Sequence, residues 1–213
     1  YEAAPYEMGT TAHRPHVGDD GRPSTGWHAQ FGDVDNDARP DLFISKGNVD
    51  QMPGLAMEDP NTMLLQQADR TFREVAAEAG VAVTARSRGA ALADLDGDGR
   101  LDIAVVNRRA PMSLHRNATP DTGAWLKLDL RQPGPNRFAL GAIVTVETEG
   151  HRQVQEITVG GGHAGGQAVP LHFGLGPAAH ARVSVTWPDG TTSPPRDMTA
   201  GRTHRIDRVH PPG

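Results

Sequence analysis

The chain has 213 residues, with 26 acidic and 21 basic side chains and a formal net charge of −5 at pH 7. It contains no cysteine, which excludes disulfide bonds, cysteine-ligated zinc and a cysteine nucleophile. No apolar run approaches the roughly 18 residues that span a membrane, and no basic patch indicates a nucleic-acid partner. The 25 glycines and 17 prolines predict many turns, so we expect an all-β chain.

Residues 1–23 show no clear periodicity, and we expect an extended N-terminal arm with room for one strand. His13 and His16 form a His-x-x-His pair, for which a solvated loop is favoured over a metal site. The chain begins at Tyr1 without a signal sequence, which we interpret as a mature or trimmed product.

Four aspartates then occupy positions 1, 3, 5 and 9 of a nine-residue loop, and the same spacing returns 61 residues later. The two sets are Asp33, Asp35, Asp37, Asp41 and Asp94, Asp96, Asp98, Asp102. Carboxylates this close repel one another and need a cation if all are to stay ionised. Oxygen ligands at alternate positions suit a hard ion, so the spacing predicts two calcium sites. We expect the backbone carbonyls of Arg39 and Arg100, at position 7, to be the fifth ligands.

The simpler alternative is a pair of Asp- and Gly-rich turns without a metal, because both residue types are common in turns. Two copies with the same spacing favour the metal. An EF-hand is excluded, since it needs a glutamate at position 12, where this chain has Ile44 and Val105. Apolar residues follow each loop, at 42–44 and 103–106, so each loop is expected to lead into a buried strand.

The repeat extends beyond the aspartates, since Ala29 corresponds to Ala90 and Phe31 to Leu92. Short strands repeated at this period are typical of one propeller blade per copy. Phe31-Gly32, followed by Asp-x-Asp-x-Asp-x-x-x-Asp and an apolar strand, resembles the FG-GAP (VCBS-type) calcium-binding β-propeller repeat. The resemblance implies a partial β-propeller of about two blades in residues 24–118.

The two copies differ at one position, where the first has Ala38 and the second has Gly99. If this position needs a positive φ, alanine strains the turn. We therefore expect the first site to be the weaker of the two.

Between the loops, residues 61–66 and 71–75 predict a hairpin turning at Ala68–Arg70, followed by one helical turn that Gly80 closes. Residues 47–60 form a long connection, either a binding loop or a permissive surface insertion. A further strand is expected at 113–117.

We place a domain boundary near residue 119 and assign 119–213 to a second all-β domain. Alternating apolar residues predict strands at 125–130, 143–147, 155–159, 183–187 and 203–208. About six short strands in this length indicate a small β-sandwich or barrel.

Four motifs of this second domain, in this order, resemble the ASPIC/UnbV domain: Asn136-Arg137 followed by Leu140-Gly141-Ala142, then Gly160–Gly166, then Leu171–Gly176, then Trp187–Gly190. That domain follows FG-GAP-type repeats in bacterial secreted proteins and in the cartilage acidic protein family. One departure is the glycine-rich run at 160–166, where a larger, often aromatic residue is expected.

These patterns favour a calcium-stabilised binding or scaffold module, extracellular or periplasmic, with a bacterial source indicated by the lysine-poor composition. A closed propeller needs at least four blades, so we expect an additional propeller segment or subunit as partner. The sequence does not indicate the identity of any small-molecule ligand. We interpret the chain as the C-terminal part of a larger β-propeller assembly.

The alternative is an enzyme of small-molecule, natural-product metabolism with its active site near the glycine-rich loop. His163 and His28 are the candidate acid–base groups, whereas His172 reads as a buried core residue. A pocket that gathers His163 with a second titratable group would favour this alternative. A third alternative is carbohydrate binding by the second domain, which needs exposed aromatic residues on one face. Only Trp125 and Trp187 are available for it.

Overall fold

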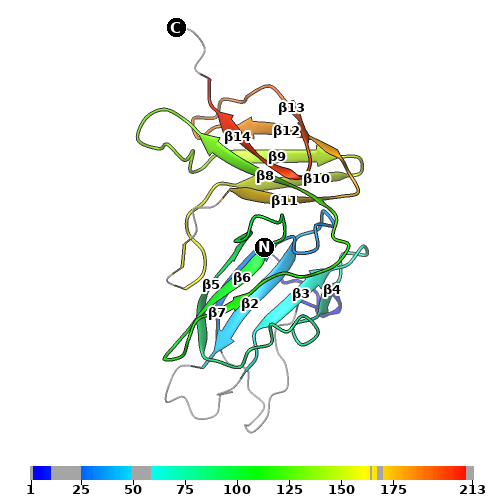
Figure 1. Ribbon diagram of the computed structural model, residues 1–213, viewed down its shortest axis with the longest axis vertical. Coiled ribbons are helices and arrows are strands. Elements are labelled where there is room, and N and C mark those ends of the chain that lie inside the picture. Colours follow the sequence, from blue (N-terminus) through cyan, green and yellow to red (C-terminus); the bar gives the residue numbers. More distant parts are fainter. Residues whose placement is uncertain (1, 11–24, 49–58, 164, 167–169, 210–213) are drawn as a thin grey trace.

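The computed structural model describes residues 2–10, 25–48, 59–163, 165–166 and 170–209. In these ranges the chain forms fourteen strands in four sheets and one short 3-10 helix, η1 (Tyr6–Met8). Figure 1 shows two units, with β1–β7 in the lower one and β8–β14 in the upper one. The all-β prediction is confirmed. Within the described ranges, no helix has the length and apolar character needed to cross a membrane.

The lower unit, here called the blade pair, consists of two antiparallel sheets that follow chain order. The first sheet contains β1 (Thr25–Gly32), β2 (Asp41–Gly47), β3 (Thr62–Gln66) and β4 (Phe72–Glu74), and the second contains β5 (Ser87–Ala93), β6 (Asp102–Asn107) and β7 (Ser113–His115). Each Asp-rich loop joins the first strand of its sheet to the second. The predicted hairpin is present as β3 and β4, with Arg70 in its turn at φ 69°.

One hydrophobic cluster lies between the two sheets of the blade pair. Phe43 and Met63 from the first sheet pack with Leu92, Ile103 and Val105 from the second. Alternate residues of a strand point to opposite faces, so Ile103 and Val105 share the buried face of β6 while Val106 is 56% exposed on the other. The two sheets therefore stack face to face, as neighbouring blades do.

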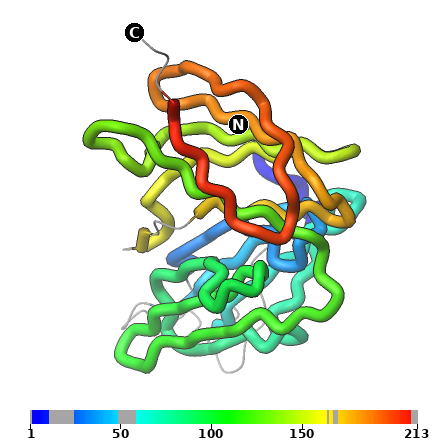
Figure 2. The backbone as a smooth tube through the Cα atoms, turned by 45° about the horizontal axis from the view of Figure 1, so that its top comes forward, coloured from blue at the N-terminus to red at the C-terminus, as the bar shows by residue number. Residues whose placement is uncertain are grey.

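The upper unit, here called the C-terminal unit, is a two-sheet sandwich. One sheet has the order β11 (Leu171–Gly176), β8 (Ala124–Arg131), β14 (Arg202–Asp207), and the other has the order β10 (His151–Glu156), β9 (Ile143–Thr148), β12 (His180–Thr186), β13 (Arg196–Thr199). Leu126, Leu128 and Leu130 form one side of its core, as their alternation predicts, against Val144 and Val146. The sandwich is confirmed, and the described strands do not close into a barrel. Figure 2 shows its last strands, orange to red, on the side away from the blades.

Two details of this unit differ from the prediction. The strand expected at 155–159 is β10, which ends at Glu156, and β13 was not expected at all. Only Met198 is buried in β13, so the strand carries no periodic apolar signal. In β10, the side-chain amides of Gln153 and Gln155 donate hydrogen bonds to the carbonyls of Gly174 (2.6 Å) and His172 (2.7 Å). These two bonds join the edge strands β10 and β11 of the two sheets.

The glycine-rich run packs directly on the first blade, which explains why small residues stand there. The backbone amide of His163 donates to the carbonyl oxygen of Trp27 (2.8 Å). Gly162 has φ 53°, and a Cβ at this position would overlap the His28 ring. A larger residue would push the C-terminal unit away from β1. The His13–His16 pair and most of the 47–60 loop lie outside the described residues.

We expect Gly162→Ala to destabilise the protein by about 1 to 3 kcal/mol, because the new methyl group overpacks against His28 and the backbone keeps a positive φ. Gly134→Ala is the matched control, since Gly134 has φ 89° with nothing within 4 Å of its would-be Cβ. Urea unfolding of both variants measures the difference. Equal losses would show that the contact with His28 carries no packing constraint.

Candidate functional site: two Asp-rich loops beneath the C-terminal unit

The first Asp-rich loop, here loop 1 (residues 33–41), wraps around the carboxylate of Asp33. Its Oδ1 accepts a hydrogen bond from the backbone amide of Asp37 (3.0 Å), and its Oδ2 accepts one from that of Ala38 (2.8 Å). The turn requires positive φ at Asn36 (60°) and Ala38 (71°). Ala38 therefore has the left-handed conformation that the comparison with Gly99 anticipated.

The second loop, here loop 2 (residues 94–102), repeats this arrangement. Asp94 accepts backbone hydrogen bonds from Gly97 (2.7 Å, Oδ1) and Gly99 (2.9 Å, Oδ2), and both glycines have positive φ, 81° and 89°. In each loop the position-5 aspartate accepts from the amide of the arginine at position 7, at 2.8 Å for Asp37 and 3.0 Å for Asp98. The aspartates at positions 1 and 5 therefore accept backbone hydrogen bonds in both loops, as the repeated spacing suggests.

The position-9 aspartates tie each loop to its blade. Asp41 accepts from the amides of Val34 (2.9 Å) and Gln66 (2.9 Å), and Asp102 accepts from the equivalent Leu95 (2.9 Å) and from Asn117 (2.8 Å). Both carboxylates are almost fully buried, with 1% and 3% exposure. Because both oxygens of each carboxylate already accept backbone hydrogen bonds, these residues hold the loop closed whether or not they also bind an ion.

Three carboxylates converge in each loop. In loop 1 these are Asp33, Asp35 and Asp37, and in loop 2 they are Asp94, Asp96 and Asp102, each set offering oxygens within 4.8 Å of one another. All donors are oxygens, which suits calcium. Asp41 and Asp98 lie in the same loops but outside these groups. The arginine side chains at position 7 turn back to pair with Asp37 and Asp98, and the predicted role of their carbonyls stays a prediction.

The electrostatics of the two loops differ. Burial and the neighbouring carboxylates of Asp41, Asp37 and Asp35 raise the pKa of Asp33 to about 8. Burial likewise raises the pKa of Asp41 to about 7, although backbone hydrogen bonds from Val34 and Gln66 oppose it. The pKa of Asp37 is also raised, chiefly by burial. A bound cation would relieve this repulsion, so the donor set of loop 1 fits calcium.

Loop 2 already has positive partners. Burial of Asp94 favours a higher pKa, but a hydrogen bond from Lys127 and backbone amides outweigh it and lower the pKa. A hydrogen bond from Arg116 lowers the pKa of Asp96. Sequence reasoning missed both partners, because they lie 33 and 20 residues away in the chain from the aspartates they contact.

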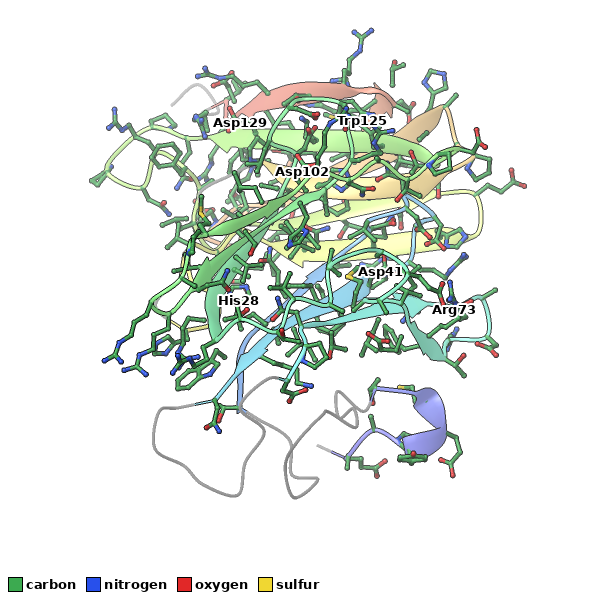
Figure 3. All side chains as sticks on the ribbon, turned by 60° about the horizontal axis from the view of Figure 1, so that its bottom comes forward. His28, Asp41, Arg73, Asp102, Trp125 and Asp129 are labelled. Atoms are coloured by element: carbon green, nitrogen blue, oxygen red, sulfur yellow. The ribbon has the colours of Figure 1, made fainter. Side chains whose placement is uncertain are left out.

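The C-terminal unit rests on both loops. The amides of Gly123 and Gly176 donate to the carbonyls of Asp35 (3.0 Å) and Asn36 (2.8 Å) in loop 1. In loop 2, Nε2 of His172 donates to the carbonyl of Gly99 (3.1 Å), and burial lowers the pKa of His172 to about 4. Figure 3 labels Asp41 and Asp102, the position-9 aspartates of the two loops, together with Trp125 and Asp129 of the C-terminal unit.

A pocket of about 370 Å³ lies between β1, β5 and the C-terminal unit, lined among others by His28, His172 and Glu156. His163 is not among its described lining residues. The His163 ring is exposed and meets the Trp27 ring edge-on, with centroids 4.7 Å apart. His28 is 3% exposed, with Nε2 3.1 Å from Oε1 of Gln30. The pocket therefore does not gather His163 with a second titratable group.

The two candidate aromatic platforms are also engaged. The Trp125 indole occupies the space above Gly99, so a Cβ at Gly99 would overlap it. Trp187 is 3% exposed, and its Nε1 donates to Oγ of Ser193 (2.7 Å). The Trp125 ring is partly exposed, and Nζ of Lys127 lies 5.0 Å from its centroid.

Comparisons with known proteins agree with this two-unit architecture. A family model described as an FG-GAP-like repeat matches residues 54–105, and one described as ASPIC and UnbV matches residues 132–210. The two resemblances seen in the sequence are therefore confirmed by family models. The FG-GAP-like match covers loop 2, whereas loop 1 lies before it.

The chain is similar to cartilage acidic protein 1 from three animals. The Homo sapiens and Mus musculus proteins are both 28% identical over 162 residues, 74% of this chain and 24% and 25% of theirs. The Xenopus tropicalis protein is 32% identical over 109 residues, 49% of this chain and 17% of its own length. The chain thus spans about a quarter of the length of the human and mouse relatives.

In a chelating buffer we expect the melting temperature to fall as pH rises from about 5 to 8. Asp33 and Asp41 keep protons in the folded chain to about pH 8 and 7, above the ordinary value of 3.8, so stability present below pH 4 is lost across this window. Asp33→Asn removes one of these carboxyls and should give a shallower fall. The same slope for both proteins, by differential scanning fluorimetry, would contradict the electrostatics of loop 1.

Proposed function

We propose that this chain is a calcium-stabilised binding or scaffold module of an extracellular or periplasmic protein, and the C-terminal part of a larger propeller. The observation that carries the proposal is loop 1, where the oxygens of three aspartates lie within 4.8 Å of one another. Of these, only Asp37 has a basic partner, Arg39, among the described residues. Calcium at the millimolar concentrations found outside cells fills sites of this kind.

Calcium in loop 1 would stabilise more than a turn. Loop 1 joins β1 to β2, and its backbone carbonyls at Asp35 and Asn36 accept hydrogen bonds from Gly123 and Gly176. Fixing the loop therefore fixes the surface on which the C-terminal unit docks. The free energy of calcium binding then contributes directly to the stability of the folded chain.

The open face of the second blade supports a further propeller segment as partner. Leu114 pairs with Ala104 and shares its face with Val106, opposite the core between the blades. Val106 and Met112 are 56% exposed and Leu114 is 61% exposed, and β7 is the outer strand of its sheet. Exposed apolar residues next to an unpaired edge are typical of a covered surface. We infer that the next blade of the whole protein covers it.

The enzyme alternative has less support. Its best candidate, His163, lies on the surface against Trp27, and His28 is buried beneath the glycine-rich run. No described contact joins either ring to a carboxylate that would orient it as a general base. The scaffold function therefore accounts better for these residues, which hold the two units together.

Calcium should raise the melting temperature of the chain. A ligand at 100 times its Kd adds about 2.7 kcal/mol, which corresponds to about 5 to 10 °C for a chain of this size. Asp33→Asn should abolish most of the difference between calcium and chelator. Asp69→Asn is the control, since Asp69 is an exposed turn residue of the same blade. A calcium response of wild-type size in Asp33→Asn would contradict the assignment of the site to loop 1.

The exposed face of the second blade should cause self-association when the chain is isolated. We expect Leu114→Asp to shift the chain toward monomer in light scattering after size-exclusion chromatography, with little change in melting temperature. Val209→Asp replaces a side chain of similar exposure, 77%, at the far end of the C-terminal unit and should change nothing. A wild-type chain that stays monomeric at high concentration would remove the support for a covered face.

A further inference from the structure

Loop 2 is held by positive side chains of the chain itself. Nε of Arg116 lies 2.6 Å from Oδ2 of Asp96, and Nη2 of Arg116 lies 3.1 Å from Oδ2 of Asp98. One guanidinium thus bridges the aspartates at positions 3 and 5. The other oxygens of these two carboxylates accept backbone hydrogen bonds, so Arg116 takes the oxygens that would remain for an ion.

Lys127 completes this arrangement from the other unit. It belongs to β8, and its Nζ lies 2.5 Å from Oδ2 of Asp94, the position-1 aspartate. The side chains are largely buried, with 14% exposure for Lys127 and 1% for Asp94. All three aspartates at positions 1, 3 and 5 of loop 2 therefore contact a basic side chain from outside the loop.

Loop 1 differs at the corresponding places. Where Asp94 meets Lys127, Oδ2 of Asp33 faces the backbone of Gly174, whose added Cβ would overlap that oxygen. Among the described residues, the ion pair of loop 1 is that between Asp37 and Arg39, a residue of the loop itself. The C-terminal unit thus brings a glycine to one loop and a lysine to the other.

We propose that Arg116 and Lys127 compete with calcium for loop 2, so that loop 1 fills first and loop 2 fills only when these contacts are released. This inference rests on the proposed calcium site in loop 1. Because Lys127 also joins β8 to the blade pair, occupation of loop 2 loosens the docking of the C-terminal unit. The second site then responds to calcium at higher concentration than the first.

The competition reverses the ranking expected from Ala38 and Gly99. Ala38 already has φ 71° in the structure, so calcium does not have to impose the strained conformation on loop 1. In loop 2, calcium has to displace two basic side chains from carboxylate oxygens. Breaking the charge pairs of loop 2 costs binding free energy, whereas the positive φ of Ala38 in loop 1 is already present before calcium binds. The cost to calcium binding is therefore larger in loop 2.

Calcium titration by isothermal calorimetry of the full chain, starting from chelator-treated protein, tests the inference. Wild type should show a tight step that Asp33→Asn removes, followed by a weak step. In the Asp33→Asn background, Arg116→Gln and Lys127→Met should each tighten the remaining step by about tenfold, since each removes a positive charge beside the ion. Arg73→Gln is the control, because Arg73 pairs with Glu78 at an exposed site away from both loops.

The outcomes separate the two proposals. If Arg116→Gln and Lys127→Met leave the second step unchanged or weaken it, the competition is wrong, while a tight step lost in Asp33→Asn still supports loop 1. If wild type has no step that depends on Asp33, the proposed function fails. In that case a step that appears only in Arg116→Gln or Lys127→Met would still support the competition in loop 2.

Discussion

The repulsion between closely spaced aspartates is the constraint on which the rest of this structure depends. Each blade turns from its first strand to its second through a loop with four carboxylates, and the backbone amides of the loop do not neutralise them. In loop 2, the positive side chains of Arg116 and Lys127 pair with Asp96 and Asp94 and offset this repulsion. In loop 1, Asp33 and Asp35 have no such partner among the described residues, and burial raises the pKa of Asp33 to about 8. A divalent cation is the simplest source of the missing charge.

The same loops position the C-terminal unit, so a change in the charge balance of either loop also affects how the two units contact each other. Glycines at 123, 174 and 176 let its backbone approach loop 1 closely, and Trp125, Lys127 and His172 contact loop 2. The glycine-rich run adds a third contact on His28 and Trp27. Close approach to the blades therefore explains the glycines at 123, 162, 174 and 176.

Local patterns were sufficient to predict the all-β class and most of the strands. The aspartate spacing located both loops, and alternating leucines at 126, 128 and 130 located β8, because these signals need only neighbouring residues. The bounds of β10 were predicted too late in the chain, and β13 was not predicted. Both strands have few buried side chains, so their sequences lack the alternation of apolar residues that marks a strand. The partners of loop 2 could not be predicted, since Lys127 and Arg116 reach the aspartates only after the sheets have assembled. The surroundings of His28 could not be predicted for the same reason, because only the folded chain shows that Gly162 packs against its ring.

The most direct test of a calcium-dependent loop 1 is the anomalous X-ray scattering of calcium in crystals grown at a calcium concentration that saturates the first binding step. The arrangement of charges predicts one strong peak among the carboxylates of Asp33, Asp35 and Asp37, with Lys127 and Arg116 still bound to loop 2. A peak in loop 2 with these side chains withdrawn, and none in loop 1, would contradict it. A map without a peak in either loop would show that hydrogen bonds alone support these carboxylates.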